Sequence, residues 1–219
     1  MFRIDYLSPL SIIIPGIVAI IRLRKIDRIY YPFLYLIWLT SLNEVASLII
    51  VKAGYYTFIN NNIYVLPQFL LILVFFRNLG SIKGKFFNIT VFSLVILWIF
   101  DCFFLGKFST GICEYFSLAE YLIIVILSIN KINELVSTIK GNILRHSVFL
   151  ICIAFIIYYT YWILETSFWT YGLNSRGKDW NFLWSIYYIM IYINLFIYFL
   201  YVAAILLMPK KEPYSQALY

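Results

Sequence analysis

A chain of 219 residues in which 63% of the side chains are hydrophobic and 12% are charged cannot cover a water-soluble globule with polar groups. The composition therefore excludes an ordinary soluble protein and predicts an integral membrane protein, whose surface is mostly in contact with the lipid bilayer. The net charge of +7 is explained first by membrane topology, so no nucleic-acid partner is expected.

Seven apolar runs are long enough to be membrane spans. They cover residues 6–21, 30–51, 63–76, 86–105, 112–129, 147–168 and 182–208, of which the third is short and the last is long. Backbone groups inside a bilayer must bond to one another, and the runs lack the alternation of barrel strands, so each should be a helix. We therefore predict an all-α fold, with one seven-helix transmembrane domain over residues 1–208 and a short cytoplasmic tail over 209–219.

The basic residues between these runs are distributed unevenly. Twelve of the 17 lie on one side, in segments 22–28, 77–85, 131–145 and 210–211, and five lie on the other. Positively charged loops are retained in the cytoplasm. The sequence thus predicts an N-terminus outside, a cytoplasmic C-terminus, and a multi-pass location in the inner (cytoplasmic) membrane of the cell.

The cysteines and the histidine give no sign of a metal centre. Three cysteines are too few for a disulfide framework, and their spacing relative to His146, the single histidine, fits no metal site. No metal and no cofactor are therefore predicted. Cys102 and Cys113 flank one predicted outer loop and could pair, although unpaired cysteines are the commoner case in membrane proteins.

The most informative feature is where the acidic residues fall within the predicted spans. At about 1.5 Å per residue, Glu44 lies roughly 20 Å from the cytoplasmic end of its helix, and Glu120 roughly 12 Å from the outer end of its own. Asp101, Glu114 and Glu165 lie near the outer ends of their helices. No acid occupies the inner half of any span, so polarity should converge on one level in the outer half of the membrane.

Helical spacing places these acids among other polar and aromatic side chains. Thr40, Glu44 and Ser47 share a face of the second helix, and Trp162 shares a face of the sixth with Glu165. An ionisable group on the lipid face costs on the order of 3 kcal/mol or more, so such faces should point into the bundle or a water-filled cleft. No lysine or arginine lies in the outer half of any span, so the acids are candidates for protonation or for binding a cation.

The sequence therefore predicts an acidic, aromatic pocket open to the outer side. Its predicted ligand-binding residues are Glu44, Glu120, Glu165, Gln68, Asn43, Tyr161 and Trp162. The carboxylates would bind a cation, a proton or a small amine, the aromatic rings would form a wall, and the amides would supply hydrogen bonds. In the alternative interpretation the acids are structural, because buried polar side chains can join membrane helices through hydrogen bonds of roughly 1 kcal/mol.

Several enzyme classes lack their chemistry in this chain. His146 is predicted at the cytoplasmic side, opposite the acids, which argues against a zinc hydrolase and against a Ser-His-Asp triad. The seventh helix has no lysine for a retinal Schiff base, and no glycine-rich phosphate loop is present. Whether the protein is an enzyme stays open, with the balance against it.

Three segments carry a resemblance to known proteins. They are Ile63–Leu70 at the start of the third helix, Trp98–Phe104 at the end of the fourth, and Glu114–Leu122 in the fifth. With this span pattern, nearly the whole chain resembles small, uncharacterised seven-helix inner-membrane proteins of Bacteroidota-type bacteria. The resemblance implies a fold and a location but no activity.

Pro67-Gln68 is also similar to the motif of PQ-loop and SWEET-like transporters, which resemble this chain in having seven helices and an outside N-terminus. Those families have two three-helix repeats, each with its own Pro-Gln. The corresponding fifth helix here has the segment 117–120, of sequence SLAE and without proline, which departs from that pattern.

Three functional hypotheses remain. The first is a receptor-like or sensory module in which an outer ligand biases a helix rearrangement that a partner protein reads. The second is a small-molecule or ion-coupled transporter, and the third is a structural subunit of a membrane complex. Polarity confined to the outer half favours the first, because a transport route should also show polar groups in the inner half. The expected partners are the lipid bilayer, a small cationic ligand, and a membrane or cytoplasmic protein.

Overall fold

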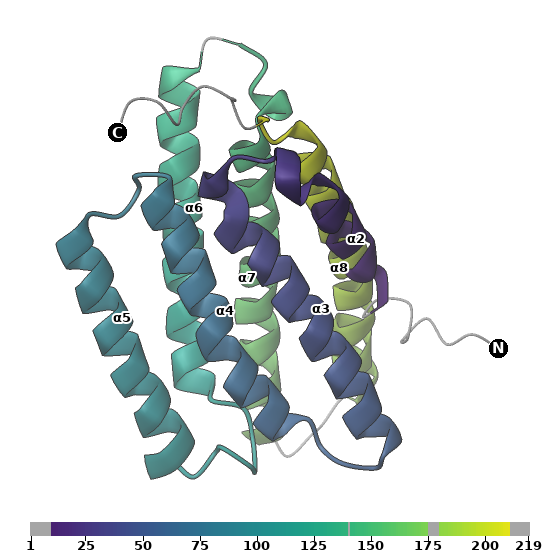
Figure 1. The fold of residues 1–219 in the computed structure, drawn as a ribbon. Coiled ribbons are helices and arrows are strands. Elements are labelled where there is room, and N and C mark those ends of the chain that lie inside the picture. Colours follow the sequence, from purple (N-terminus) through teal and green to yellow (C-terminus); the bar gives the residue numbers. More distant parts are fainter. Residues whose placement is uncertain (1–9, 140, 175–179, 211–219) are drawn as a thin grey trace.

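The structure, a computed structural model, describes residues 10–139, 141–174 and 180–210. Every element assigned within these ranges is a helix, and none is a strand. The helices pack side by side as one bundle (Figure 1). The predicted all-α fold is confirmed at this level, and the part of the predicted tail beyond residue 210 lies outside the described residues.

The described chain forms seven α-helices joined by short segments. They are α2 (Ile13–Arg22), α3 (Tyr31–Lys52), α4 (Phe58–Asn78), α5 (Gly84–Ile99), α6 (Glu114–Thr138), α7 (Ser147–Asn174) and α8 (Trp180–Leu207). Single 3-10 turns η1 (Leu23–Lys25), η2 (Arg28–Tyr30) and η4 (Ile143–Arg145) lie between them, and a π-helical turn, η3 (Phe100–Phe104), continues α5. Six helices, α3 to α8, are long and apolar enough to cross a membrane, as expected for an integral membrane protein.

Four helices differ in extent from the predicted spans, and one of them is α7, which continues to Asn174, beyond the run predicted at 147–168. Helix α4 begins at Phe58, five residues before the predicted run, and at 21 residues is not short. The run of asparagines at 60–62 interrupts the hydropathy but not the helix. Helix α6 continues past the end of the apolar run to Thr138, and its last turns are rich in polar residues. Helix α2 has ten residues, and residues 6–9 of the run predicted at 6–21 lie outside the described residues.

Helix α5 lies at the rim of the bundle, where it packs mainly against α4, α6 and its own continuation η3 (Figure 1). Leu94 is the one buried residue of this helix. The closest packing is instead among α6, α7 and α8, and between α3 and α4. The polar residues that converge inside the molecule therefore come mainly from α3, α4, α6 and α7.

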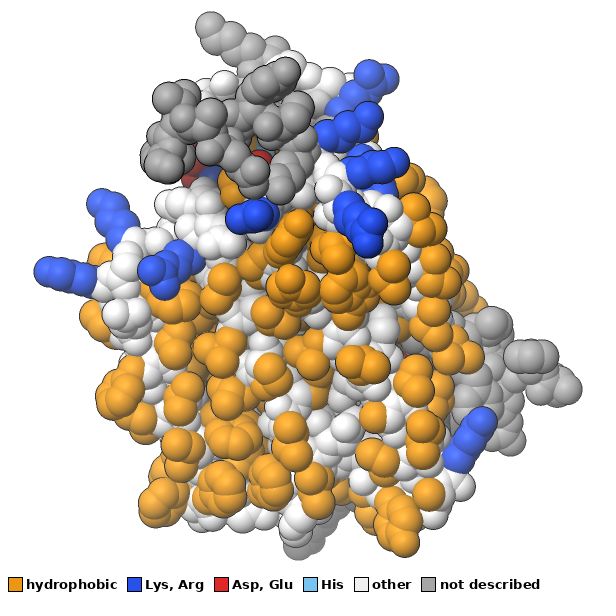
Figure 2. All heavy atoms as spheres, viewed as in Figure 1, with side chains coloured by type: hydrophobic (Ala, Val, Ile, Leu, Met, Phe, Trp, Pro, Cys, Tyr) orange, Lys and Arg blue, Asp and Glu red, His pale blue; other side chains and the backbone are white. Residues whose placement is uncertain are grey.

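The two ends of the bundle have different character. We call the end that carries the segments 23–30, 79–83 and 139–146 the basic end, and the opposite end, with the segments 53–57 and 105–113, the disulfide end. Figure 2 shows Lys and Arg side chains gathered at the basic end and a mostly hydrophobic lateral surface. Cations also satisfy helix C-termini there, because Arg22 donates to the carbonyls of Ile205, at 2.7 Å, and Leu206.

A cluster of rings fills the bundle near the basic end. We call it the aromatic layer; its members are Phe33, Phe75, Phe76, Phe155 and Tyr201, from α3, α4, α7 and α8. All are buried, and neighbouring ring centroids lie 5.2 to 6.3 Å apart. This spacing suits edge-to-face and tilted packing of aromatic rings. The layer closes the bundle on its basic side.

Candidate functional site

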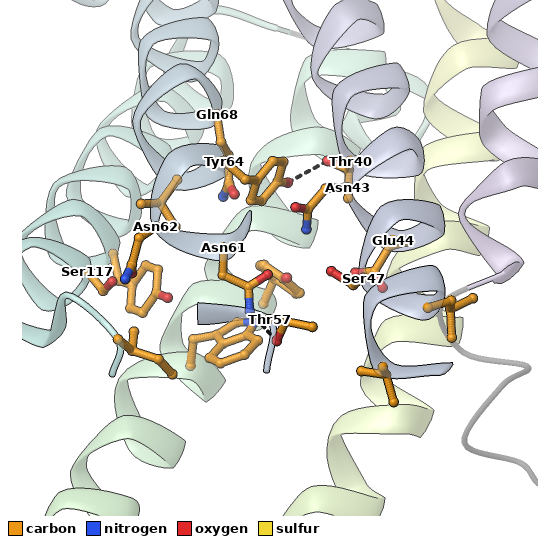
Figure 3. A pocket seen from close by; sticks show the side chains of 17 residues that line it. Thr40, Asn43, Glu44, Ser47, Thr57, Asn61, Asn62, Tyr64, Gln68 and Ser117 are labelled. Atoms are coloured by element: carbon orange, nitrogen blue, oxygen red, sulfur yellow. Dashed lines mark hydrogen bonds between the residues drawn. The ribbon is translucent and has the colours of Figure 1, made fainter. Parts of the chain in front are cut away.

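A cavity of about 430 Å³ lies between α3, α4, α6 and α7 at the disulfide end (Figure 3). Val51, Thr57 and Ile112 line it near the end of the bundle, and Thr40 and Gln68 line it at its deepest level. Thr40 and Val51 are eleven positions apart along α3, which corresponds to a depth of about 16 Å. The cavity is thus a deep pocket entered from the disulfide end.

Two walls of the cavity are polar because helical spacing repeats their side chains on one face. Helix α3 contributes Thr40, Asn43, Glu44 and Ser47, and α4 contributes Asn61, Tyr64 and Gln68. The walls are joined at two levels. The Thr40 and Tyr64 hydroxyls lie 2.7 Å apart, and Asn60 donates to Asn43 at 2.8 Å and to Ser47 at 2.9 Å. These bonds hold α3 and α4 at a fixed separation around the pocket.

Aromatic rings from α6 and α7 also line the cavity. Tyr158 and Trp162, one helical turn apart on α7, pack at 6.1 Å between centroids, and Tyr121 of α6 lies 6.2 Å from Trp162. The described ion pairs are Lys107–Glu114 and Lys131–Glu134, so no described cation is paired with Glu44. The cavity therefore combines one carboxyl group without an ionic partner, amide and hydroxyl groups, and ring faces.

The structure brings together four of the seven residues predicted for the pocket. Asn43, Glu44, Gln68 and Trp162 all line the cavity. At the deep end, the Gln68 side-chain nitrogen donates to the Tyr159 hydroxyl at 2.6 Å, which fixes α4 against α7. The predicted meeting of acid, amide and aromatic groups thus has a physical location between α3, α4 and α7.

The other three predicted residues lie elsewhere. Glu120 is fully buried in α6 beside the cavity but does not line it, and neither of its carboxyl oxygens has a hydrogen-bond partner among the described residues. Glu165 is buried in α7, closer to the disulfide end of the bundle. The Tyr161 hydroxyl donates to the carbonyl of Ile186 and so joins α7 to α8. The bond directs the Tyr161 side chain toward α8, whereas the neighbouring Trp162 lines the cavity.

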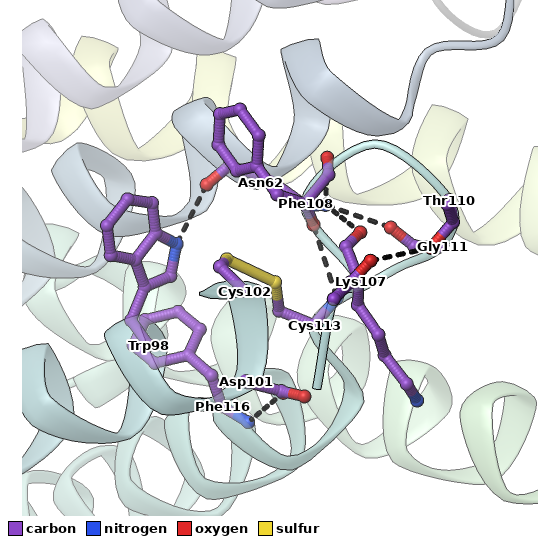
Figure 4. The surroundings of a disulfide bond; sticks show 11 residues. Asn62, Trp98, Asp101, Cys102, Lys107, Phe108, Thr110, Gly111, Cys113 and Phe116 are labelled. Carbon is purple, nitrogen blue, oxygen red and sulfur yellow. Dashed lines mark hydrogen bonds between the residues drawn. A yellow bond between two sulfur atoms is a disulfide. The ribbon is translucent and has the colours of Figure 1, made fainter. Parts of the chain in front are cut away.

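Asn62 is a structural residue of the site that the sequence interpretation missed. Its amide nitrogen donates to three carbonyls of the 105–113 segment, those of Lys107, Phe108 and Gly111, at 2.9 to 3.2 Å (Figure 4). Its side-chain oxygen accepts from the backbone N–H of Cys113 at 3.2 Å. Asn62 also lines the cavity, so it ties the cavity wall to this loop. The signal in the sequence was the run of three asparagines at the start of an apolar helix.

Cys102 and Cys113 form a disulfide, with 5.8 Å between their Cα atoms (Figure 4). The expectation that unpaired cysteines are the commoner case is therefore wrong here. The π-helical turn places Asp101 beside Cys102, and the Asp101 carboxylate accepts from the Phe116 N–H at 3.1 Å, in the first turn of α6. Because Ile112 of this closed loop lines the cavity, the disulfide fixes part of the pocket wall.

A second, much smaller cavity lies deeper in the bundle. It has a volume of about 20 Å³ and shares Thr40, Tyr64 and Gln68 with the main cavity. Its far side is lined by Tyr198 and by Tyr201, which also belongs to the aromatic layer. A space of this size holds about one water molecule. The polar interior therefore continues past the floor of the main cavity and stops at the aromatic layer.

The described residues contain no group of three or more His, Cys, Asp or Glu side chains arranged to hold a metal ion. Comparisons with protein families, with curated proteins and with solved structures give no match to this chain. The function must therefore be argued from the cavity itself.

Proposed function

We propose that this chain is a receptor-like membrane protein that binds a small organic cation, of the amine class, in the main cavity. The observation that carries the proposal is the Glu44 carboxyl group, which lines a cavity of about 430 Å³ together with Tyr158 and Trp162 and has no described ionic partner. Ligand pockets commonly measure roughly 300 to 1,000 Å³. A carboxylate and ring faces attract the same ligand, because the ring quadrupole favours a cation.

The proposed topology is seven spans with the basic end in the cytoplasm. The twelve basic residues on that side support this orientation. The disulfide supports it independently, since disulfides persist in oxidising compartments such as the bacterial periplasm and are rare in the cytosol. In this proposal, residues 6–21 form the first span, and the cavity opens outward from the inner membrane, the location that the resemblance to small seven-helix proteins also implies.

The aromatic layer favours a receptor over a transporter. Phe33, Phe155 and Tyr201 are buried across the bundle between the main cavity and the basic end, so the described residues at this level put aromatic rings where a transporter would need a polar route. A ligand held between α3 and α7 would change how those helices pack. A cytoplasmic or membrane partner that contacts the basic end would then bind the two arrangements with different affinity. The small cavity lined by Tyr198 favours the second candidate, an ion-coupled transporter, in which the layer would have to open.

Thermal unfolding of the purified protein with a panel of primary and quaternary amines tests the proposal. A ligand present at 100 times its Kd raises the unfolding free energy by about 2.7 kcal/mol, so at least one amine should raise the Tm of the wild type. Glu44→Gln should abolish that increase. Glu114→Gln is the matched control, because Glu114 pairs with Lys107 outside the cavity and should leave the increase intact.

An amine that stabilises wild type and Glu44→Gln equally would contradict the proposal, and so would a panel without effect. Flux assays in proteoliposomes separate the two candidates. The receptor requires binding without amine or proton flux above empty vesicles, whereas flux that Glu44→Gln abolishes would establish the transporter.

A further inference from the structure

Glu120 is a buried acid that amine binding at Glu44 does not use. Its exposed fraction is 0%, and neither carboxyl oxygen has a hydrogen-bond partner among the described residues. It lies on α6 next to Tyr121 and three residues from Ser117, and both of those side chains line the main cavity. The carboxyl group is therefore enclosed immediately behind the cavity wall.

An ionised carboxylate is strongly unfavourable in such a place unless a cation or several hydrogen-bond donors compensate it. The described lysines in ion pairs are held elsewhere, Lys107 by Glu114 and Lys131 by Glu134 and the Leu79 carbonyl. No described ion pair involves Glu120. The neutral acid, which carries a proton, is the form that fits this enclosure.

The titratable groups around Glu120 come from several helices. Tyr64 of α4, Tyr158 and Tyr159 of α7 and Tyr121 of α6 itself are close enough to feel its charge. Asp101 lies by the start of α6, where it accepts from Phe116, one turn before Glu120. All of these groups are neutral or acidic, so none offers a positive charge to a Glu120 carboxylate.

Glu44 and Glu120 act on a shared pair of rings. Tyr64 and Tyr158 line the main cavity and lie within electrostatic range of both carboxyl groups. A positive charge bound in the cavity would therefore lie near Glu120 as well as near Glu44. Such a charge stabilises the carboxylate form of Glu120, because attraction between opposite charges is weakly screened away from water.

We propose that Glu120 is a proton-binding site coupled to the cavity, where a cation that binds beside Glu44 displaces the proton of Glu120. The O–H bond of the Glu120 acid breaks, its electron pair stays on the carboxylate, and the proton leaves to water in the cavity. One cation enters as one proton leaves, so the charge of the enclosed site does not change. This inference rests on the proposed function, and it adds that cation affinity rises with pH.

Infrared difference spectroscopy tests the proton site without any ligand. At about pH 7 the wild type should show the carbonyl-stretch band of a protonated carboxylic acid, and Glu120→Gln should lack it. Glu114→Gln is the control, because the ion-paired Glu114 should contribute no such band. Glu120→Asp should shift the band instead of removing it, which keeps the test decisive if the glutamine variant does not fold. A spectrum unchanged by both Glu120 variants would overturn the proton site.

Calorimetric titration with benzylammonium tests the coupling. In two buffers of different ionisation enthalpy, the wild type should release up to one proton per cation bound, with a roughly tenfold higher affinity at about pH 8 than at about pH 6. Glu120→Gln should release fewer protons per cation than the wild type and show a weaker pH dependence, and what remains belongs to Glu44. Equal proton release from the variant would overturn the coupling.

The two proposals fail in different ways. If benzylammonium does not bind the wild type, the displacement of the proton is overturned along with cation binding by this probe. The infrared band still decides whether Glu120 holds a proton. If the cation binds and Glu44→Gln abolishes its binding, but no proton is released, the proposed function stands and the coupling to Glu120 is wrong.

Discussion

The disulfide end and the basic end of this bundle are held together by different forces. At the disulfide end, Asn62 donates to three loop carbonyls, Asn60 joins α3 to α4, and a disulfide closes the 105–113 segment. Near the basic end, the rings of the aromatic layer are buried against one another, and Tyr201 also lines the small cavity. Directional bonds can hold walls apart around a void, whereas burial and dispersion favour the filling of space.

This difference explains how an open cavity persists inside a membrane bundle. Inside a bilayer, helices associate through close packing and interhelical hydrogen bonds. The aromatic layer supplies the packing, and the bonded polar walls supply the shape of the site. The comparison therefore separates residues that stabilise the fold from residues that shape the cavity, the proposed ligand site, and substitutions at the two ends should have separable effects.

The largest expected effect is on the aromatic layer. Phe155→Ala should lower the unfolding free energy by about 3 to 5 kcal/mol, because Phe155 is fully buried against Phe33, Phe76 and Tyr201. Amine affinity per folded molecule should change little. Phe92→Ala is the matched control, since Phe92 is 68% exposed on the outer face of α5, and its Tm should move far less. Chemical unfolding and amine titration of both variants measure the two quantities.

The next largest effect should come from loss of the disulfide, which should change both the stability of the fold and the affinity of the cavity for amines. Replacing Cys102 and Cys113 together by Ser should lower stability by about 3 kcal/mol, the chain-entropy effect for a loop of this length. It should also weaken amine binding, because Ile112 of the loop lines the cavity. Reductant should reproduce both losses in the wild type. Cys152→Ala, which removes the free buried cysteine, should leave the sensitivity to reductant unchanged. Unaltered amine affinity in the double variant would show that the loop does not shape the site.

The class of fold could be predicted from the sequence because hydrophobic runs report lipid exposure directly. The extents of α4 and α6 could not, because polar turns such as 60–62 and 130–138 continue a helix without any hydropathy signal. Hydropathy describes the environment of side chains, whereas the helix is held by backbone hydrogen bonds that do not depend on it. Helix ends in the interfacial region are therefore the least visible part of such a fold.

The depth of the site was predictable, but the direction of each side chain was only partly so. Rise per residue places Glu44 and Glu120 in the same half of the membrane whatever the packing. The rotation of α6 about its axis then decides that Ser117 and Tyr121 line the cavity while Glu120 lies behind it. That rotation depends on how α6 packs against α7, which no periodicity within one helix specifies.

The smallest expected effect lies at the basic end, outside the spans. His146 precedes α7, and partial burial together with the nearby Lys131 charge lowers its pKa below the ordinary value of 6.5. The unfolded chain therefore binds a proton more readily than the native state, so stability is complete above about pH 6.5 and declines as the pH falls below it. Because His146 is only half-buried, the loss should stay below about 1 kcal/mol. His146→Gln should flatten the dependence of the unfolding free energy on pH between about pH 7.5 and 5. If the variant loses as much stability at acid pH as the wild type, that loss belongs to other groups. This pH dependence should be the same with the disulfide intact or reduced, so its measurement in both states tests whether the two ends of the bundle respond independently.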